Sequence, residues 1–212
     1  MVDRERVEAA VRELIAAIGD DPRREGLATT PQRVAEAYEE FFAGVGDDPL
    51  RHLTGSDVRL DDAAVDAAPA DAEVVLLRGL RFRSMCEHHL LPFTGVAHVA
   101  YLPGERIVGL GRVPRVIDTL AARPQLQERL TEQIADVLEA GLEPRGVLVV
   151  LEASHGCMMH RGPRQQESST VTVASRGGLA ESAARAETLG LIALGARAGA
   201  GDVAQPESVG GA

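Results

Sequence analysis

The spacing of hydrophobic residues predicts two amphipathic helices in the first part of the chain. Apolar residues recur at helical spacing over 7–18, and Gly19 follows as a stop signal. Thr30 followed by Pro31 is typical of a helix N-cap with proline at the first helical position. The helix that begins there carries Phe41 and other apolar residues on one face. Both helices precede the residues that carry chemistry, so we expect them to contribute packing.

After residue 73 the hydrophobic pattern predicts alternating strands and helices. Strand-like runs cover 74–83, 95–102, 146–153 and 168–175, and Pro103-Gly104-Glu105 predicts a tight hairpin turn into a further strand at 107–110. Helical spacing covers 116–120, 126–138 with Gly141 as its stop signal, and a last amphipathic segment at 189–194. This order predicts an α+β fold, with an antiparallel sheet and helices packed on one face.

Composition divides the chain into four parts. Residues 1–45 form an N-terminal helical extension, and 46–72 form an acidic connection that is rich in Asp, Gly and Ala and is expected to be flexible. Residues 73–194 hold the predicted sheet and its helices, and we expect them to be the catalytic domain. The Gly- and Ala-rich tail, 195–212, is expected to be disordered.

The charge of the chain excludes some partners. Its formal net charge of −10 over 212 residues argues against nucleic acid or an anionic membrane as a general partner. A local group of arginines can still bind an anionic small molecule. The chain has no apolar run long enough to span a membrane, and Met1-Val2-Asp3-Arg4 lacks the apolar core of a signal peptide. Because the two cysteines also suit a reducing compartment, we expect a cytoplasmic protein.

Both cysteines of the chain lie in patches rich in metal-ligating side chains. Cys86 and His89 have a spacing that lets both side chains reach one ion from a turn, and Cys157 lies in a second patch with His155. Cys and His are preferred ligands of zinc, and three protein ligands leave a fourth position for water, as in a catalytic site. On the residues alone, the alternative is a chance grouping of buried cysteines with structural histidines.

Four runs of the sequence carry a family resemblance. Arg24–Ala35, Cys86–Gly95 with its Cys-Glu-His-His start, Gln125–Thr131 with Gln-Glu-Arg, and His155–Gly162 with His-x-Cys-Met closely resemble GTP cyclohydrolase I. The similarity extends in order from about Val7 to about Thr172. It implies the T-fold (tunnelling fold), in which sheets of several subunits join edge to edge. It also implies a homo-oligomer, a decamer in this family, with active sites between subunits.

The resemblance assigns the metal site and the acid–base groups. It implies that Cys86, His89 and Cys157 are the ligands of Zn²⁺, which lowers the pKa of a bound water towards about 7. It further implies that His88 is a general acid/base and that His155 assists it, as imidazoles suit proton transfer near neutral pH. The alternatives are that His88 supports the metal ligands and that His155 only bonds to backbone.

The resemblance also assigns the substrate-binding residues. Glu128 corresponds to the carboxylate that anchors guanine, with Gln127 beside it, and the paired N–H groups of guanine suit such an acceptor. Arg112, Arg115 and Arg161 correspond to positions that hold the triphosphate, which guanidinium groups bind well. Without the resemblance, the residues around Glu128 would be interpreted as an exposed helix face.

One departure from the family pattern lies beside these arginines. The family commonly has Gly-Leu-Ser-Lys where this chain has Gly109-Leu110-Gly111-Arg112. Arg112 keeps the charge of the lysine with a different geometry. Gly111 lacks a hydroxyl that in the family lies near the sugar and phosphates, so a bound water replaces it or the later steps are slowed.

The function that the resemblance implies is zinc-dependent hydrolysis of GTP to 7,8-dihydroneopterin triphosphate and formate, the first step of tetrahydrofolate and pterin biosynthesis. Two alternatives stay open. One is a related cyclohydrolase that stops at a formylated or ring-opened pyrimidine, because Gly111 lacks the hydroxyl. The other is a catalytically silent paralogue that binds a purine or pterin, against which the retention of Cys86, His88, His89 and Cys157 weighs.

Overall fold

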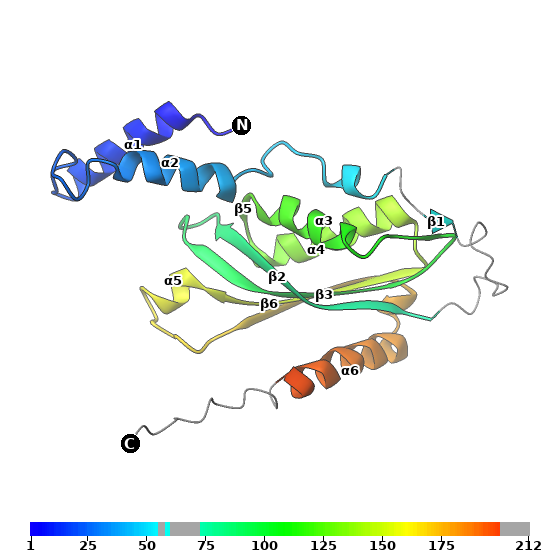
Figure 1. The fold of residues 1–212 in the computed structure, drawn as a ribbon. Coiled ribbons are helices and arrows are strands. Elements are labelled where there is room, and N and C mark those ends of the chain that lie inside the picture. Colours follow the sequence, from blue (N-terminus) through cyan, green and yellow to red (C-terminus); the bar gives the residue numbers. More distant parts are fainter. Residues whose placement is uncertain (55–57, 60–72, 200–212) are drawn as a thin grey trace, which may run out of the picture.

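Five strands form one sheet within residues 1–54, 58–59 and 73–199, which are the residues that the structure, a computed structural model, describes (Figure 1). The strand order is β5-β2-β3-β6-β7. The strands are β2 Val75–Cys86, β3 Pro92–Leu102, β5 Pro124–Gln125, β6 Gly146–His155 and β7 Thr170–Gly177. Neighbouring strands pair antiparallel except β2 and β5, which are parallel. The predicted α+β class with an antiparallel sheet is confirmed.

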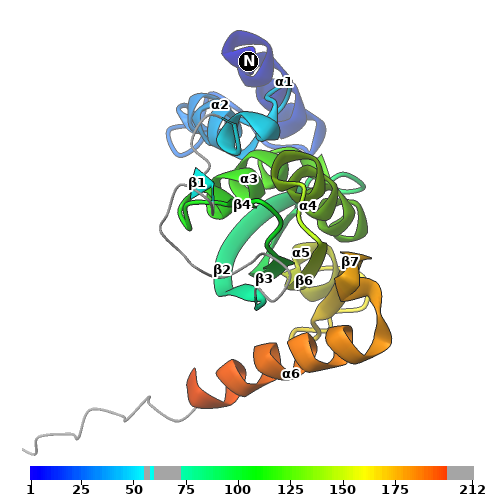
Figure 2. The same cartoon turned by 90° about the vertical axis from the view of Figure 1, so that its right-hand side faces the viewer.

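Two helices, α3 (Arg112–Ala121) and α4 (Gln127–Leu142), cover one face of this sheet (Figures 1 and 2). Phe93, Val99 and Tyr101 of β3 lie in the core beneath them, because alternate residues of a strand point to the same side. The apolar residues of both helices recur every three or four positions and fill the same core. The two predicted helices of this region are confirmed, and the arrangement is consistent with the tunnelling fold.

The opposite face of the sheet carries a further helix. The short helix η3 (Gly178–Ala180) leads into α6 (Ser182–Gly199), which lies under the sheet in Figures 1 and 2. Leu189 and Ile192, three residues apart on α6, pack against a second buried cluster that includes Leu148. The prediction of helices on one face therefore holds for α3 and α4, and α6 covers the other face.

The N-terminal helices α1 (Arg4–Ala17) and α2 (Thr30–Phe41) pack against each other beyond the sheet (Figure 1). The N-cap of α2 is Thr29 rather than the predicted Thr30, and its side chain makes no capping hydrogen bond. An ion pair of 2.9 Å between Glu40 and Arg83 joins α2 to β2, and the Arg83 guanidinium lies 5.3 Å from the centre of the Phe41 ring. These contacts fix the helical pair to the sheet.

The predicted hairpin at 103–105 is wrong. Residues after it form only the short strand β4 (Arg106–Ile107), which pairs antiparallel with β1 (Val58–Arg59) in a separate two-stranded sheet. The reason is that both edges of β3 are already hydrogen-bonded, one to β2 and the other to β6. No edge of β3 is left for the strand that follows it.

Gly141 does not end α4 as predicted. The helix continues to Leu142, and Glu143 takes the left-handed conformation (φ 48°) that closes it. A side chain at position 141 would meet Leu53, since a Cβ built there lies 2.5 Å from its Cδ1 atom. Gly141 therefore permits close packing, and it cannot be replaced without moving Leu53 or α4.

The fully buried Leu53 belongs to the segment that was predicted to be a flexible connection. It follows the short helix η1 (Pro49–His52), so the first part of that segment is folded against α4. Residues 55–57 and 60–72 lie outside the described residues. The predicted disordered tail, 195–212, begins inside α6, because this helix continues to Gly199. Residues 200–212 lie outside the described part of the chain. Within the described residues, no helix has the length and hydrophobicity needed to cross a membrane.

Candidate metal centre and active site

Three potential metal ligands converge at one end of the sheet. Cys86 ends β2, His89 lies in the turn between β2 and β3, and Cys157 lies in the short helix α5 (Gly156–Met159) that follows β6. Because β3 is antiparallel to both β2 and β6, the end of β2, the start of β3 and the end of β6 meet at this place. One ligand atom from each residue lies within 4.8 Å of the others. The structure thus brings the predicted ligands together.

The turn that carries His89 is held by its backbone and by one ion pair. The Cys86 N–H donates to Leu91 O (2.9 Å), and the Leu90 N–H donates to Cys86 O (2.8 Å). Leu90 takes a left-handed conformation with φ 49°. Glu87 accepts hydrogen bonds from the guanidinium of Arg129 on α4, which also lowers the pKa of the Glu87 carboxyl. The turn is therefore anchored to the start of α4.

Cys157 is placed by a close contact between α5 and β3. A Cβ at Gly156 would lie 2.8 Å from Pro92 O, so the backbone can approach β3 only because this residue is glycine. Partial burial raises the pKa of the Cys157 thiol, and the neighbouring thiol of Cys86 raises it further. A bound cation would favour both thiolates, and two thiolates with one imidazole suit a borderline-soft ion such as zinc. The three residues therefore fit that metal.

Two further predicted residues lie at this cluster. Nη1 of Arg161 is 3.2 Å from Nε2 of His89, and since a guanidinium can only donate, Nε2 accepts in this contact. The rings of His88 and His89 meet edge to face with their centres 6.1 Å apart, and both side chains are exposed. A cationic group and a second imidazole are thus available on the open side of the cluster.

His155, the last residue of β6, lies between an aromatic ring and a buried amide. Its ring stacks on Phe93 with centres 4.7 Å apart and planes inclined by 5°. Its Nε2 atom is 2.7 Å from Oε1 of Gln127. Burial lowers the pKa of His155, whereas the nearby carboxylate of Glu128 acts to raise it. Glu128 itself is exposed in the first turn of α4, so a carboxylate is available beside this imidazole.

Gln127, one of the predicted substrate-binding residues, lies beside His155. Its side chain is buried, and every polar atom of it has a partner within the chain: Leu151 O, Thr170 O and Thr172 Oγ1 for Nε2, and His155 for Oε1. The interpretation of this segment as an exposed helix face is also wrong for Gln127, although Glu128 and Arg129 are exposed. Its burial follows from its place at the start of α4, directly above β6 and β7.

Arg112 and Arg115 lie away from the metal cluster in one chain. They occupy the first turn of α3, beside η1, where Nη1 of Arg112 donates to His52 O (2.9 Å). Their charges contribute, after burial and Arg51, to lowering the pKa of the neighbouring His52 imidazole. Along α3, Arg112 lies about 14 Å and Arg115 about 9 Å from Ala121, the last residue before the connection to β5. Among the described residues, neither arginine contacts Arg161 or a potential metal ligand.

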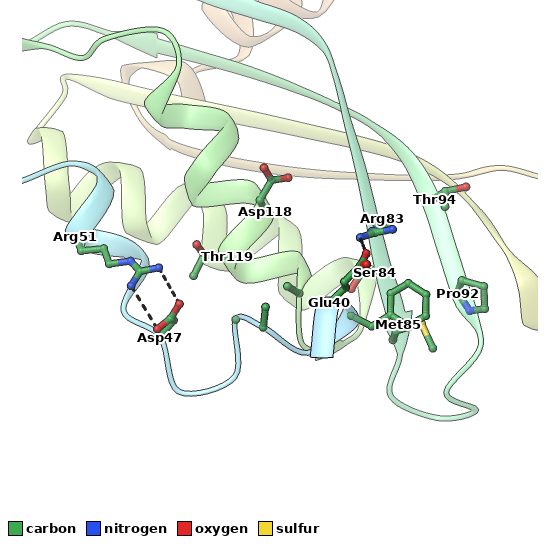
Figure 3. Close-up of a pocket in the computed structure, with 14 residues that line it drawn as sticks. Glu40, Asp47, Arg51, Arg83, Ser84, Met85, Pro92, Thr94, Asp118 and Thr119 are labelled. Carbon is green, nitrogen blue, oxygen red and sulfur yellow. Dashed lines mark hydrogen bonds and ion pairs between the residues drawn. The ribbon is translucent and has the colours of Figure 1, made fainter. Parts of the chain in front are cut away.

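A cavity of about 630 Å³ lies elsewhere, between α2, β2 and α3 (Figure 3). None of the three potential metal ligands lines it. Much of its charge is paired, Asp47 with Arg51 at 2.8 Å and Glu40 with Arg83 at 2.9 Å. The chemistry-bearing residues are instead gathered at the end of the sheet, which we take as the candidate active site.

The sequence matches a known family over most of its length. The family model of GTP cyclohydrolase I matches residues 7–193. The chain belongs to the GTP cyclohydrolase I family. It is 63% identical over 194 residues to GTP cyclohydrolase 1 of Leifsonia xyli subsp. xyli, covering 92% of this chain and 97% of that protein. GTP cyclohydrolase 1 of Clostridioides difficile is 50% identical over 195 residues, covering 91% and 98%.

Among solved structures, the apo form of the archaeosine synthase QueF-Like is 18% identical with a TM-score of 0.39, covering 50% of this chain and 94% of that one. The resemblance to GTP cyclohydrolase I that the four sequence runs carry is confirmed, and with it the assignment of the chain to a family of enzymes.

Two contacts that shape the site of this chain were not predicted from its sequence. One is the ion pair of Glu87 with Arg129, and the other is the stacking of His155 on Phe93. A signal for the first was present, because Glu87 and Arg129 lie in two separate matching runs and carry opposite charges. The second follows from the strand register, which places Phe93 opposite His155.

Proposed function

We propose that this chain is a zinc-dependent enzyme that converts GTP and water into 7,8-dihydroneopterin triphosphate and formate. The observation that carries the proposal is the cluster of Cys86, His89 and Cys157, which gathers two thiols and an imidazole in a member of the GTP cyclohydrolase I family. When bound there, zinc supplies a water of lowered pKa, which allows attack on C8 of guanine near neutral pH.

The other groups at this end of the sheet bind the base and move protons. Glu128 accepts the N1–H and 2-amino groups of guanine, because its exposed carboxylate lies next to the half-buried His155. His88 delivers the proton to the ring nitrogen when the imidazole ring of the base opens, and His155 assists at the sugar oxygen. Both histidines lie within two residues of a potential metal ligand in the sequence, which supports these roles.

The triphosphate requires cations that one chain does not gather at this site. Arg161 already lies at the cluster, whereas Arg112 and Arg115 lie in the first turn of α3 beside η1. We propose that a second copy supplies Arg112 and Arg115, which places the active site between subunits of a homo-oligomer, a decamer by family resemblance. The first turn of α3 suits phosphate, since the positive end of the helix dipole lies beside these arginines.

A related activity remains as the second candidate, and Gly111 is the observation that favours it. Gly111 lacks the hydroxyl that the family has near the sugar, so a product that stops at a formylated or ring-opened pyrimidine would follow if the later steps fail. We also propose a cytoplasmic location, because both cysteines of the cluster are free thiols.

The test is to incubate the purified, zinc-loaded protein with GTP and to measure formate and pterin fluorescence. Both signals are the expected result. Formate or an opened pyrimidine without pterin would establish the second candidate. Neither signal, from protein with full zinc content, would leave a silent purine- or pterin-binding paralogue.

A further inference from the structure

We infer that Gln127 is a positioning residue that fixes His155 as the Nε2–H tautomer, so that Nδ1 is the ring nitrogen that acts on the substrate. This inference rests on the proposed function and deepens it. Gln127 is the first residue of α4, and its side chain is 1% exposed. Its Oε1 atom is 2.7 Å from Nε2 of His155.

The orientation of the Gln127 amide is set by backbone oxygens. Its Nε2 atom lies 2.8 Å from Thr170 O and 3.2 Å from Leu151 O, and both of these oxygens can only accept. If the amide were flipped, its oxygen would face two other oxygens with no proton between them. The nitrogen must therefore point to β6 and β7, and Oε1 must point to His155.

Two hydroxyls on the same side of α4 complete this arrangement. Thr131 donates to the backbone oxygen of Gln127 at 2.7 Å, so its contact with Thr172 at 2.6 Å needs the Thr172 hydroxyl as donor. Thr172 Oγ1 is then an acceptor for the Gln127 amide, 3.1 Å away. The hydroxyl protons of Thr131 and Thr172 therefore each have one acceptor, and both assignments require the same orientation of the Gln127 amide. A buried network with every member satisfied is rigid.

The fixed amide determines the protonation of the imidazole. Since Oε1 of Gln127 can only accept, Nε2 of His155 must carry a proton. In the neutral ring the lone pair is then on Nδ1, which has no hydrogen-bond partner among the residues that the structure describes. Stacking on Phe93 fixes the plane of the ring, so the ring does not rotate away from this contact. The nitrogen left for the substrate is Nδ1.

This role differs from a direct contact between Gln127 and guanine. The amide of Gln127 has two protons, and three acceptors already lie within hydrogen-bond distance of its nitrogen. To bind a base, the Gln127 side chain would have to leave its buried position, and His155 would then lose its hydrogen-bond acceptor. The exposed Glu128 next to it has no such constraint.

The kinetic test compares Gln127→Met with Gln125→Met in zinc-loaded protein. Gln125 is the matched control, because it is also buried and its amide donates to Leu120 O and Gln133, with no contact to His155. We expect Gln127→Met to lower kcat by about 10- to 100-fold with KM for GTP and zinc content unchanged. Gln125→Met should lose comparable thermal stability and keep its kcat.

Two kinetic results would overturn the inference. A raised KM with an unchanged kcat in Gln127→Met would mean that Gln127 contacts the substrate. Equal kcat in Gln127→Met and Gln125→Met, with equal loss of stability, would mean that Gln127 only supports the fold.

A spectroscopic test needs no substrate. Solid-state NMR of protein with ¹⁵N-labelled histidine rings distinguishes the two neutral tautomers, and a His155→Ala sample assigns the His155 signals. We expect a proton on Nε2 and none on Nδ1 in the wild type, and a mixture of tautomers in Gln127→Met. A wild-type proton on Nδ1 would refute the inference. If instead the wild type releases no formate from GTP, the proposed function fails while these spectra still decide the tautomer.

Discussion

The metal end and the arginine end of the candidate site differ in how much of each a single chain provides. At the metal end, strand ends, a tight turn and α4 gather the thiols of Cys86 and Cys157 beside a buried network around His155. At the arginine end, the first turn of α3 presents the exposed Arg115 and the half-buried Arg112 beside η1, about 9 and about 14 Å of helix from Ala121.

The fold of one subunit fixes the geometry of the metal end, whereas the arginine end of a site must be supplied by assembly with another subunit. The metal end is held by strand pairing, so its geometry is a property of one subunit. The arginine end gains a function in the proposed mechanism only when another copy brings it to a triphosphate. Variants at the metal end should therefore act within their own subunit, and variants at the arginine end should act on a neighbour.

The largest effect is expected for Cys157→Ser at the metal end. A neutral hydroxyl is a poor substitute for a thiolate on zinc, so turnover should be abolished and zinc content should fall. Zinc per chain, measured by atomic emission alongside circular dichroism, checks the result. Full zinc occupancy in a folded variant would remove Cys157 from the ligands.

His88→Ala separates proton transfer from metal binding at the same end. The side chain is exposed and meets His89 only edge to face, so its removal should leave zinc and fold intact. Activity should fall by about 10²–10⁴-fold, the usual contribution of general acid–base catalysis. Loss of zinc together with activity would instead make His88 a ligand and exchange the roles of the two histidines.

Mixed assemblies test whether the two ends belong to different subunits. Cys157→Ser and the double variant Arg112→Ala, Arg115→Ala should each be inactive or severely impaired when expressed alone. If co-expressed subunits mix at random, about one quarter of sites would combine an intact metal end with an intact arginine end from a neighbour. Activity of purified doubly tagged assemblies should therefore recover to about that fraction of the wild type.

The control for this experiment mixes Cys157→Ser with Cys86→Ala. Both variants damage the metal end, so no combination of their subunits restores a site. Equal activity in the two mixtures would contradict a site shared between subunits and would place all three arginines with their own metal cluster.

The metal end could be predicted from the sequence because its motifs lie at strand ends. The runs that begin at Cys86 and His155 each follow an apolar strand, and antiparallel pairing through β3 brings such ends together. The burial of Gln127 could not be predicted in this way. The run Gln127-Glu128-Arg129 is polar like an exposed face, and only the packing of α4 on β6 and β7 shows which residue points inward.

The errors elsewhere have the same origin in long-range contacts. The strand predicted after Pro103 pairs with residues 58–59, about fifty positions earlier, and local turn signals carry no information about that partner. Gly141 resembles a helix stop locally, but its lack of a side chain accommodates Leu53. In each case a residue far along the chain decided the outcome.

The smallest effect is expected at Gly111, the N-cap of α3 at the arginine end. Its backbone angles (φ −70°, ψ −5°) are ordinary for any residue, and a Cβ built there meets no atom within 4 Å, so serine fits without strain. Those angles lie outside the extended region typical of N-caps, so the gain in stability from Gly111→Ser should be at most a few tenths of a kcal/mol.

If the missing hydroxyl limits closure of the pterin ring, that step should accelerate in Gly111→Ser by about tenfold, which corresponds to about 1.4 kcal/mol. Ring opening and zinc content, which belong to the metal end, should not change. Single-turnover measurements of formate and pterin on both proteins distinguish the steps. Unchanged rates would show that Arg112 or a bound water already performs the role of the hydroxyl, and a change confined to ring opening would contradict the separation of the two ends.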